Sequence, residues 1–151
     1  MPVSDMLLTN DNPGSSRPVI GIGIDLVENR RMREVLERWG AAFKNRVFLA
    51  NEQSYCERKP FPHRHYAGRF AVKEAVSKAF GTGVVPHLSW LDIEVVRDGT
   101  SGAPSVRLSE RGQQLAREQS VGDVLVSLSH TRDFTVAQAI LVGCAGMGGD
   151  A

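Results

Sequence analysis

The hydrophobic residues of the 151-residue chain follow a regular pattern between residues 18 and 142. From Val19 to Asp25, isoleucine alternates with glycine, and this period of two predicts a strand with one apolar face and one face without side chains. Another backbone or a ligand can come close to a strand face that carries only glycine. We therefore expect this strand to pack tightly on a neighbour or to border a binding site.

Helical spacing occurs in two later segments. Apolar residues at positions 32, 35, 36 and 39 predict a helix over residues 29–39 that ends at Gly40. Apolar pairs that repeat every four residues predict the longest helix over residues 68–80, ended by Gly81-Thr82-Gly83. The chain between these helices is predicted to form two short helical pieces and a proline-containing loop, at residues 43–48, 52–57 and 59–63.

Strand signals dominate the rest of the core. The expected strands lie at residues 91–96, 105–108, 124–129 and 134–141. A short helix at 109–119 separates the second strand from the third, and residues 130–133 have the length of a hairpin loop between the last two. Early helices followed by hairpin-linked strands predict an α+β fold, with a largely antiparallel sheet packed against the one long helix.

The two ends of the chain differ from this core in composition. Residues 1–17 are rich in Asn, Asp, Ser, Pro and Gly, and residues 143–151 carry mostly small side chains, so we expect a flexible leader and a flexible tail around a single domain at 18–142. No apolar run approaches the roughly 20 residues of a membrane span, and the first residues lack the pattern of a secretory signal. We therefore expect a cytoplasmic protein that does not enter a membrane.

Size and charge restrict the function further. One domain of this length cannot hold a dinucleotide-binding unit and a separate substrate unit, so a large cofactor would need help from neighbouring subunits. Eighteen Lys and Arg against 17 Asp and Glu give a net charge of +1, which argues against a generic nucleic-acid binder. That average hides a division, because residues 28–78 contain 12 basic and 6 acidic side chains. The two cysteines are too few for a disulfide framework.

Two carboxylates are the first candidates for chemistry. Asp25 ends the glycine-rich strand, where a carboxylate beside bare backbone suits a hard metal ion or a phosphate site, although it could simply cap the next turn. Glu74 and Lys78 are four residues apart on one helix face, a spacing that is typical of an ordinary ion pair. The spacing alone leaves both interpretations open.

The long helix also concentrates positive charge beside a glycine-rich turn. Arg69, Lys73 and Lys78 share it with a single acid, and Gly81-Thr82-Gly83 follows directly. Cations and exposed backbone amides together favour a phosphate-binding cradle. His130, at the top of the expected hairpin, is a proton carrier, a hydrogen-bond donor to phosphate or an ordinary loop histidine.

The helix predicted at residues 29–39 carries an excess of arginine around its apolar stripe. Only Glu34 and Glu37 oppose this positive charge. It forms either an ordinary solvated face or a docking surface for an acidic protein or nucleic acid. The basic residues are Arg30, Arg31, Arg33 and Arg38.

Four segments of the chain together resemble one known family. Residues 21–28 resemble the N-terminal motif of the holo-[acyl-carrier-protein] synthases, the small 4'-phosphopantetheinyl transferases, and residues 68–83 are similar to their second motif almost throughout. Ser127-Leu128-Ser129-His130 and the segment 90–95 also have counterparts in this family. The likeness runs in order from about Val19 to Val142, and four ordered motifs are far more specific than one.

The resemblance implies the 4'-phosphopantetheinyl transferase fold and the transfer of 4'-phosphopantetheine from coenzyme A to a serine of an apo acyl carrier protein, with adenosine 3',5'-bisphosphate as the other product. It implies that Asp25 and Glu74 hold Mg²⁺, and that Lys78 lies near the pyrophosphate. Arg31 would hold the acidic carrier protein, and the chain would form a homotrimer with active sites between subunits. Five further residues lie in segments that would line the coenzyme A pocket. They are Arg69, Gly81, Thr82, Gly83 and His130.

The resemblance leaves questions about the chemistry. The catalytic set would be Asp25, Glu74, Lys78 and His130, but the base that takes the serine proton could be Glu74, a metal-bound water or His130. The alternative function is a non-catalytic module that binds coenzyme A or an acyl carrier protein, yet such a module has no need for both Asp25 and Glu74. The loop from Arg58 to His65 does not match the family pattern, so no contact is assigned to it.

Overall fold

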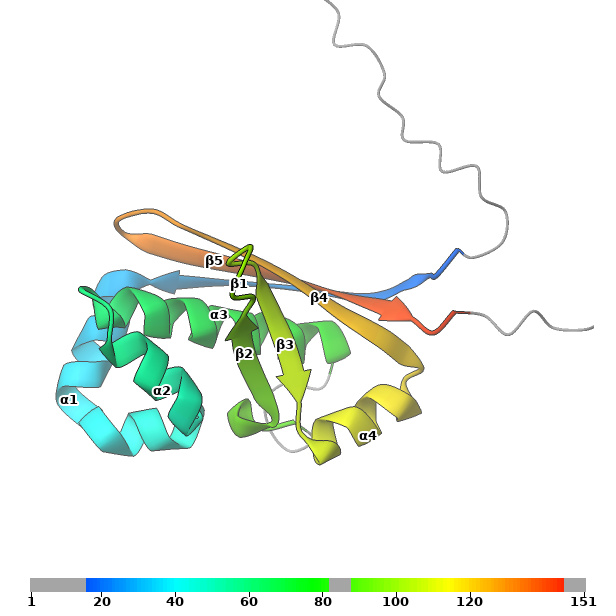
Figure 1. Ribbon diagram of the computed structural model, residues 1–151, viewed down its shortest axis with the longest axis horizontal. Coiled ribbons are helices and arrows are strands. Elements are labelled where there is room, and N and C mark those ends of the chain that lie inside the picture. The colour runs from blue at the N-terminus through cyan, green and yellow to red at the C-terminus, as the bar shows by residue number, and fades with distance from the viewer. Residues whose placement is uncertain (1–15, 82–87, 146–151) are drawn as a thin grey trace, which may run out of the picture.

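The computed structural model describes residues 16–81 and 88–145, which form helices and two antiparallel sheets (Figure 1). The larger sheet has the strand order β1-β5-β4, and the smaller one pairs β2 with β3. The α+β class expected from the sequence is confirmed. The strands are β1 (Val19–Glu28), β2 (Ile93–Arg97), β3 (Pro104–Leu108), β4 (Val121–His130) and β5 (Phe134–Gly143). The helices are α1 (Asn29–Val47), α2 (Ala50–Glu57), α3 (Pro62–Phe80) and α4 (Glu110–Glu118), with a short 3-10 helix, η1, at Trp90–Asp92.

Helix α3 runs beneath the larger sheet and forms the core with it, while α1 and α2 lie at one end and α4 at the other (Figure 1). The glycines of β1 allow this packing. A Cβ atom at Gly23 would overlap the carbonyl oxygen of Ala75 and lie 2.7 Å from the backbone nitrogen of Ala79. A Cβ atom at Gly21 would overlap the carbonyl oxygen of Ala79. The close approach expected at the glycine face of β1 is therefore made by the backbone of α3.

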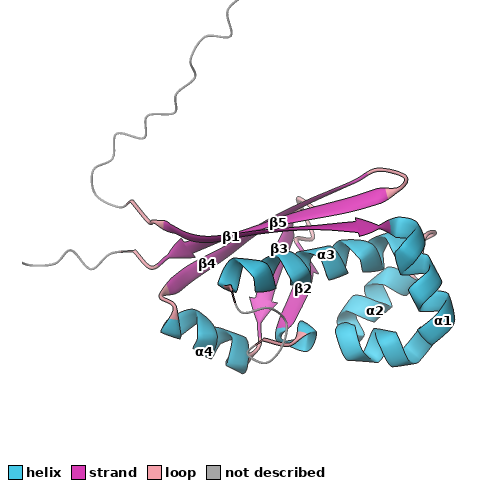
Figure 2. Cartoon of the chain, turned by 180° about the vertical axis from the view of Figure 1, so that it is seen from behind, coloured by secondary structure: helices cyan, strands magenta, loops and turns pink. Residues whose placement is uncertain are grey.

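Among the described residues, no element covers the opposite face of the larger sheet, which is largely apolar. All the helices lie on one side of this sheet, as the two opposite views show (Figures 1 and 2). Ile22 and Leu26 on β1 are 67% and 64% exposed. Cross-strand pairing places residues of β4 and β5 on the same face. We call this surface the bare sheet face; its large exposed side chains are Ile22, Ile24, Leu26, Leu125 and Phe134.

The break in the helix predicted at Gly40 is confirmed, whereas two other predicted boundaries were wrong. Gly40 adopts the non-helical angles φ 49° and ψ −128° and divides α1 into two helical segments, the second of which continues to Val47. The predicted loop at 59–63 is shorter, since α3 begins at Pro62, whose fixed φ suits the first helical turn. The strand expected from Leu91 begins only at Ile93, because the Asp92 side chain accepts a hydrogen bond from the Ser89 backbone and closes η1.

The chain is anchored at both limits of the described residues. Arg17 donates from Nε to the carbonyl oxygen of Gly143 at 3.0 Å and pairs with Asp123 at 3.1 Å. Gly143 in turn donates its backbone N–H to Pro18. The remainder of the expected leader and tail, residues 1–15 and 146–151, lies outside the described residues. Within the described part of the chain, no helix has the length and apolarity needed to cross a bilayer.

Candidate functional site

A pocket of about 460 Å³ lies where β1, α1 and α3 meet. Asp25 from β1, Glu74 from α3 and Arg31 from α1 all line it. Residues that are 49 positions apart in sequence are brought together here because the glycines of β1 let α3 lie directly against the strand. The apolar part of the lining comes from Met32, Val35, Phe43 and Phe70. We call this space the carboxylate pocket.

The Asp25 carboxylate forms an ion pair with a lysine side chain of α3. Lys78 donates from Nζ to Asp25 Oδ1 at 2.8 Å and to the carbonyl oxygen of Ile24 at 3.0 Å. The Asp25 side chain is only 15% exposed, whereas that of Lys78 is 51% exposed. The helical spacing of Glu74 and Lys78 indicated an ordinary ion pair as one interpretation, but Lys78 reaches across to β1 instead.

Glu74 has a different partner. Its Oε1 atom accepts a hydrogen bond of 2.8 Å from the indole Nε1–H of Trp90, in η1. The side chain of Glu74 therefore has a defined direction at the edge of the pocket. Sequence reasoning assigned no role to Trp90, although this residue opens the segment 90–95 that resembles a family motif.

Asp25 and Glu74 fit a magnesium site better than a site for a softer metal. Mg²⁺ is usually held by one or two carboxylates, and water and substrate phosphate oxygens complete its shell. Asp25 already attracts the ammonium group of Lys78, so this position favours a positive charge. Across residues 16–81 and 88–145, no three His, Cys, Asp or Glu side chains gather as a metal cluster. Asp25 and Glu74, which line one pocket, match the carboxylate ligands that Mg²⁺ usually takes from a protein.

A second pocket, of about 360 Å³, lies between the start of α3 and the β4–β5 loop. His130 and His65 both line it, together with Arg64 and Phe61. Burial, with the charges of Arg97 and Arg64, lowers the pKa of His130. We call this space the basic pocket; its other lining residues are Pro60, Thr131 and Arg132. An anion entering it would meet positive charge on more than one side.

Arg69 adds a buried cation close to this region. It is 5% exposed, and its guanidinium carbon lies 4.0 Å from the centre of the Tyr55 ring. Its Nε atom has no hydrogen-bond partner among the described residues, and the same holds for Nε of Arg64. Buried donors are normally satisfied, so two unpaired guanidinium nitrogens indicate a ligand with acceptor oxygens.

Other residues singled out in the sequence lie around these pockets. Gly81 ends α3 in the left-handed conformation, with φ 74° and ψ 7°. Thr82 and Gly83 lie outside the described residues. Arg31 is exposed on α1. The arginines on either side of it are neutralised by glutamates one turn further on: Arg30 pairs with Glu34, and Arg33 pairs with Glu37. Within the described part of the chain, Arg31 forms no ion pair of this kind.

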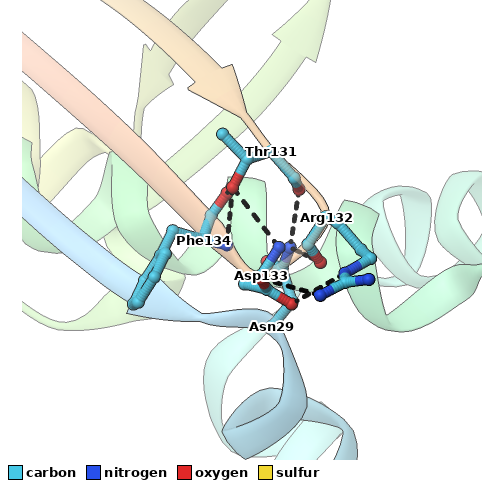
Figure 3. A network of polar contacts seen from close by, with 5 residues as sticks. All are labelled: Asn29, Thr131, Arg132, Asp133 and Phe134. Atoms are coloured by element: carbon cyan, nitrogen blue, oxygen red, sulfur yellow. Dashed lines mark hydrogen bonds and ion pairs between the residues drawn. The ribbon is translucent and has the colours of Figure 1, made fainter.

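Asn29 connects α1 to the loop that follows His130. Its side-chain Nδ2 donates to the carbonyl oxygens of Thr131 and Arg132 at 3.1 and 3.0 Å (Figure 3). Its backbone N–H donates to Asp133 at 2.8 Å, and its Oδ1 accepts from the hydroxyl of Thr135 at 2.6 Å. The buried Asn29 therefore fixes the hairpin loop at one end of the basic pocket relative to the arginine-rich helix.

Comparison with known proteins identifies the family. The family model described as the 4'-phosphopantetheinyl transferase superfamily matches residues 21–139. The chain belongs to this superfamily. The holo-[acyl-carrier-protein] synthase of Protochlamydia amoebophila is 42% identical over 121 residues, which cover 80% of this chain and 96% of that protein. The synthase of Geobacter metallireducens is 42% identical over 123 residues, which cover 82% and 97%.

Solved structures of this superfamily share the fold. The holo-[acyl-carrier-protein] synthase from Neisseria meningitidis superposes with a TM-score of 0.77 at 29% identity, covering 82% of this chain and 98% of that one. The Helicobacter pylori synthase, solved in complex with coenzyme A, gives a TM-score of 0.71 at 31% identity, covering 80% and 98%. The family and the transferase fold predicted from the four motifs are confirmed.

Sequence reasoning missed part of the basic pocket. His65, Arg64 and Phe61 fall in the stretch that could not be matched to the family pattern, so no nucleotide contact was assigned to them. The sequence shows that these residues are basic or aromatic, but their spacing gave no indication that they lie next to His130. Arg97, at the end of β2, was also missed, because it lies just outside the segment 90–95 that resembles a family motif.

Proposed function

We propose that this member of the 4'-phosphopantetheinyl transferase superfamily transfers 4'-phosphopantetheine from coenzyme A to a serine hydroxyl of an apo acyl carrier protein. The other product is adenosine 3',5'-bisphosphate. The observation that carries the proposal is the meeting of Asp25, Glu74 and Lys78 at the carboxylate pocket, in a chain whose relatives are named holo-[acyl-carrier-protein] synthases. A module that only binds coenzyme A would have no use for two carboxylates at this position.

The carboxylate pocket supplies the groups for phosphoryl transfer. Asp25 and Glu74 would hold Mg²⁺, which when bound neutralises charge on the pyrophosphate as the serine oxygen attacks and the leaving phosphate departs. Lys78, 2.8 Å from Asp25 and half exposed, is free to turn its ammonium group toward a phosphate oxygen. Glu74, in the carboxylate pocket, and His130, in the basic pocket, are the side chains that could accept the serine proton.

The basic pocket suits the phosphorylated end of coenzyme A. Arg69 and Arg64 both have an unpaired Nε atom, and His130 and His65 contribute ring nitrogens. These are donors that recognise phosphate oxygens, and Phe61 adds an aromatic face of the kind on which a base stacks. Gly81, Thr82 and Gly83, which follow the helical motif in the sequence, are also proposed to contact the nucleotide, and the motif is the only basis for this assignment.

Arg31 is proposed as the contact for the acidic carrier protein. It lines the carboxylate pocket and is exposed on α1, while the arginines on either side pair with glutamates. A carrier helix bound there would bring its serine to the mouth of the pocket that holds Asp25 and Glu74. Complementary charge at such a rim orients the partner and speeds its association.

The bare sheet face supports assembly into a homotrimer. Exposed isoleucine, leucine and phenylalanine side chains lie on three adjacent strands of one face, and such a concentration of apolar surface is unusual for a protein that acts alone. We propose that a second copy of this chain covers the bare sheet face. Asp25 lies on β1 between Ile24 and Leu26, which are two residues of that face. Contact through β1 would therefore place a neighbouring subunit next to the carboxylate pocket.

The proposed compartment is the cytoplasm. Cys56 and Cys144 are both unpaired, and Cys56 is buried with its thiol pKa raised to about 12, chiefly by burial. Unpaired thiols are in keeping with a reducing environment. Coenzyme A and acyl carrier protein would both have to be available there.

A mass measurement tests the transferase activity. The full chain is incubated with apo acyl carrier protein, coenzyme A and Mg²⁺, and the carrier is weighed by mass spectrometry. We expect a gain equal to one phosphopantetheine group, with adenosine 3',5'-bisphosphate released in equal amount. If the carrier keeps its mass while a known synthase modifies it in parallel, the transferase proposal fails. Calorimetric binding of coenzyme A in that case would identify the non-catalytic module.

A further inference from the structure

The indole of Trp90 is placed to control the direction of Glu74. Its Nε1–H lies 2.8 Å from Glu74 Oε1, and its ring packs beside Phe70 with centroids 6.3 Å apart. An indole N–H is a donor only, so it can satisfy one carboxylate oxygen but offers no lone pair to ligate a metal ion. Trp90 therefore acts on the carboxylate pocket without occupying it.

Trp90 is itself held by a buried ion pair. Lys73 donates from Nζ to the carbonyl oxygen of Trp90 at 2.9 Å and to Glu52 Oε1 at 2.6 Å. The side chains of Lys73 and Glu52 are 0% and 1% exposed, so neither can exchange its partner for water. Glu52 also accepts the backbone N–H of Val95 at 3.1 Å, just beyond η1. The backbone at Trp90 and at Val95 is thus tied to α3 and α2.

We infer that Trp90 is a positioning residue for the metal-binding carboxylate of Glu74. Because the indole occupies Oε1, Glu74 presents Oε2 to a cation at the carboxylate pocket and keeps a single orientation. Partners of this kind orient metal ligands, and their loss typically weakens metal binding by about 10- to 100-fold. The inference rests on the proposed function, in which Asp25 and Glu74 hold Mg²⁺.

The substitution Trp90→Phe tests this role, because it keeps an aromatic ring against Phe70 and removes only the N–H donor. The matched control is Trp39→Phe, which makes the same change at an indole that is 56% exposed on α1. Binding of Mn²⁺ to the full chain, without coenzyme A or carrier protein, is followed by the electron paramagnetic resonance signal of the free ion. We expect Trp90→Phe to weaken Mn²⁺ binding about 10-fold or more, and Trp39→Phe to leave it unchanged.

Steady-state kinetics add a measurement that would not change if the role of Trp90 were purely structural. With Trp90→Phe, we expect the Mg²⁺ concentration for half-maximal activity to rise by about the same factor, while KM for the carrier protein stays near that of the wild type. Equal Mn²⁺ binding by the wild type and Trp90→Phe overturns the inference. If the wild type transfers phosphopantetheine in that case, the proposed function survives and only the positioning role is lost.

A measurement on the wild-type chain covers the case in which Trp90→Phe does not fold. The indole N–H resonances of Trp90 and Trp39 are recorded during a Mg²⁺ titration, and Trp39→Phe assigns them. We expect the Trp90 resonance to move and saturate while that of Trp39 stays fixed. A Trp90 resonance that does not respond overturns the inference. If the wild type neither binds Mn²⁺ nor modifies the carrier, the metal site of the proposed function fails and the positioning role falls with it.

Discussion

At the scale of single residues, the two carboxylates of the pocket are held in different ways. Asp25 pairs with the mobile ammonium group of Lys78, whereas Glu74 accepts a hydrogen bond from a half-buried indole. An incoming metal ion can displace the ammonium group from Asp25 at little cost, because Lys78 is half exposed and can turn to a phosphate. Glu74 needs no such exchange. In the proposed metal site, Asp25 would thus be an adjustable ligand and Glu74 a fixed one.

Neutralising either carboxylate should abolish turnover. We expect Asp25→Asn and Glu74→Gln each to lower kcat/KM by about 100-fold or more, because an amide keeps the shape of the side chain but not the charge that a magnesium ion needs. The carrier mass assay measures the rate. Glu37→Gln, which removes a carboxylate from the exposed face of α1, is the control and should leave kcat unchanged. Near-normal activity of either pocket variant at limiting Mg²⁺ would show that the metal assignment is wrong.

His65 should make the stability of the free protein depend on pH. Burial, followed by the charges of Lys59, Arg69 and Arg97, lowers the pKa of His65 from 6.5 to about 4. Between these values the unfolded chain binds a proton that the folded chain excludes, so stability is present above about pH 6.5 and is lost as the pH falls toward 4.

The variant His65→Gln cannot take up this proton. We expect its thermal unfolding midpoint to fall less than that of the wild type between neutral pH and about pH 4. Above about pH 8 His65 is almost entirely uncharged in both states, and there the difference between the two proteins should not change with pH. Parallel curves over the whole acidic range would exclude His65 as the source of the effect.

At the scale of elements, α3 carries most of the organisation. Its apolar residues pack under the larger sheet, and Lys73 reaches the buried Glu52 of α2. Glu74 and Lys78, from the same helix, extend toward η1 and β1. The position of α3 against β1 therefore decides the geometry of the carboxylate pocket, and the glycines of β1 decide how closely α3 can approach.

A methyl group at Gly23 should disrupt this contact. We expect Gly23→Ala to lower the free energy of unfolding by about 3 kcal/mol or more, because the added Cβ meets backbone atoms of α3 that cannot rotate away. Urea denaturation measures the change. Gly99→Ala places the same methyl group where nothing lies within 4 Å, and should change the stability by less than about 1 kcal/mol. Similar stabilities for the two variants would contradict the close packing of β1 on α3.

Asn29 should likewise matter for the β4–β5 loop. We expect Asn29→Ala to cost about 2 kcal/mol of stability, because it removes two hydrogen bonds to the loop carbonyls and leaves the buried Thr135 hydroxyl without its acceptor. Hydrogen exchange of the loop amides should become faster. Asn45→Ala, at an exposed position of the same helix, serves as the comparison. Unchanged exchange at residues 131–134 would show that Asn29 does not hold the loop.

At the scale of the whole molecule, charge and apolar surface are separated. The segment from residue 28 to 78, with its excess of six positive charges, supplies α1, which lines the carboxylate pocket, and most of α3, which lines both pockets. The bare sheet face lies on the opposite side of the larger sheet from these helices (Figure 2). A polyanionic substrate and an acidic carrier would thus meet one side of the protein, and other copies of the chain the other side.

A charge on the bare sheet face should prevent assembly. We expect Ile22→Glu to convert the proposed trimer to smaller species, because a carboxylate would be buried without a partner between apolar faces. Light scattering coupled to size-exclusion chromatography measures the mass. Ala103→Glu adds the same charge in the exposed segment between β2 and β3, and should leave the mass unchanged. A wild-type chain that elutes as a monomer at all concentrations would contradict the proposed assembly.

The sequence by itself determined the local features of this protein. Alternation from Val19 predicted β1, four-residue periodicity predicted most of α3, and the short helix expected at residues 109–119 is α4. The family followed from ordered motifs, because these record which residue types stand at which spacing along the chain. Each of these properties depends on neighbours within one or two turns of the same element.

Only the tertiary structure decided which side chains meet. Helical spacing favoured a pair between Glu74 and Lys78, yet Lys78 binds Asp25 and Glu74 binds Trp90. The meeting of His65 with His130 across the basic pocket was equally hidden in the sequence. The physical reason is that such partners come from different elements, and their distances depend on how closely those elements pack. Here that packing is set by backbone contact between the glycines of β1 and α3, which no local spacing records.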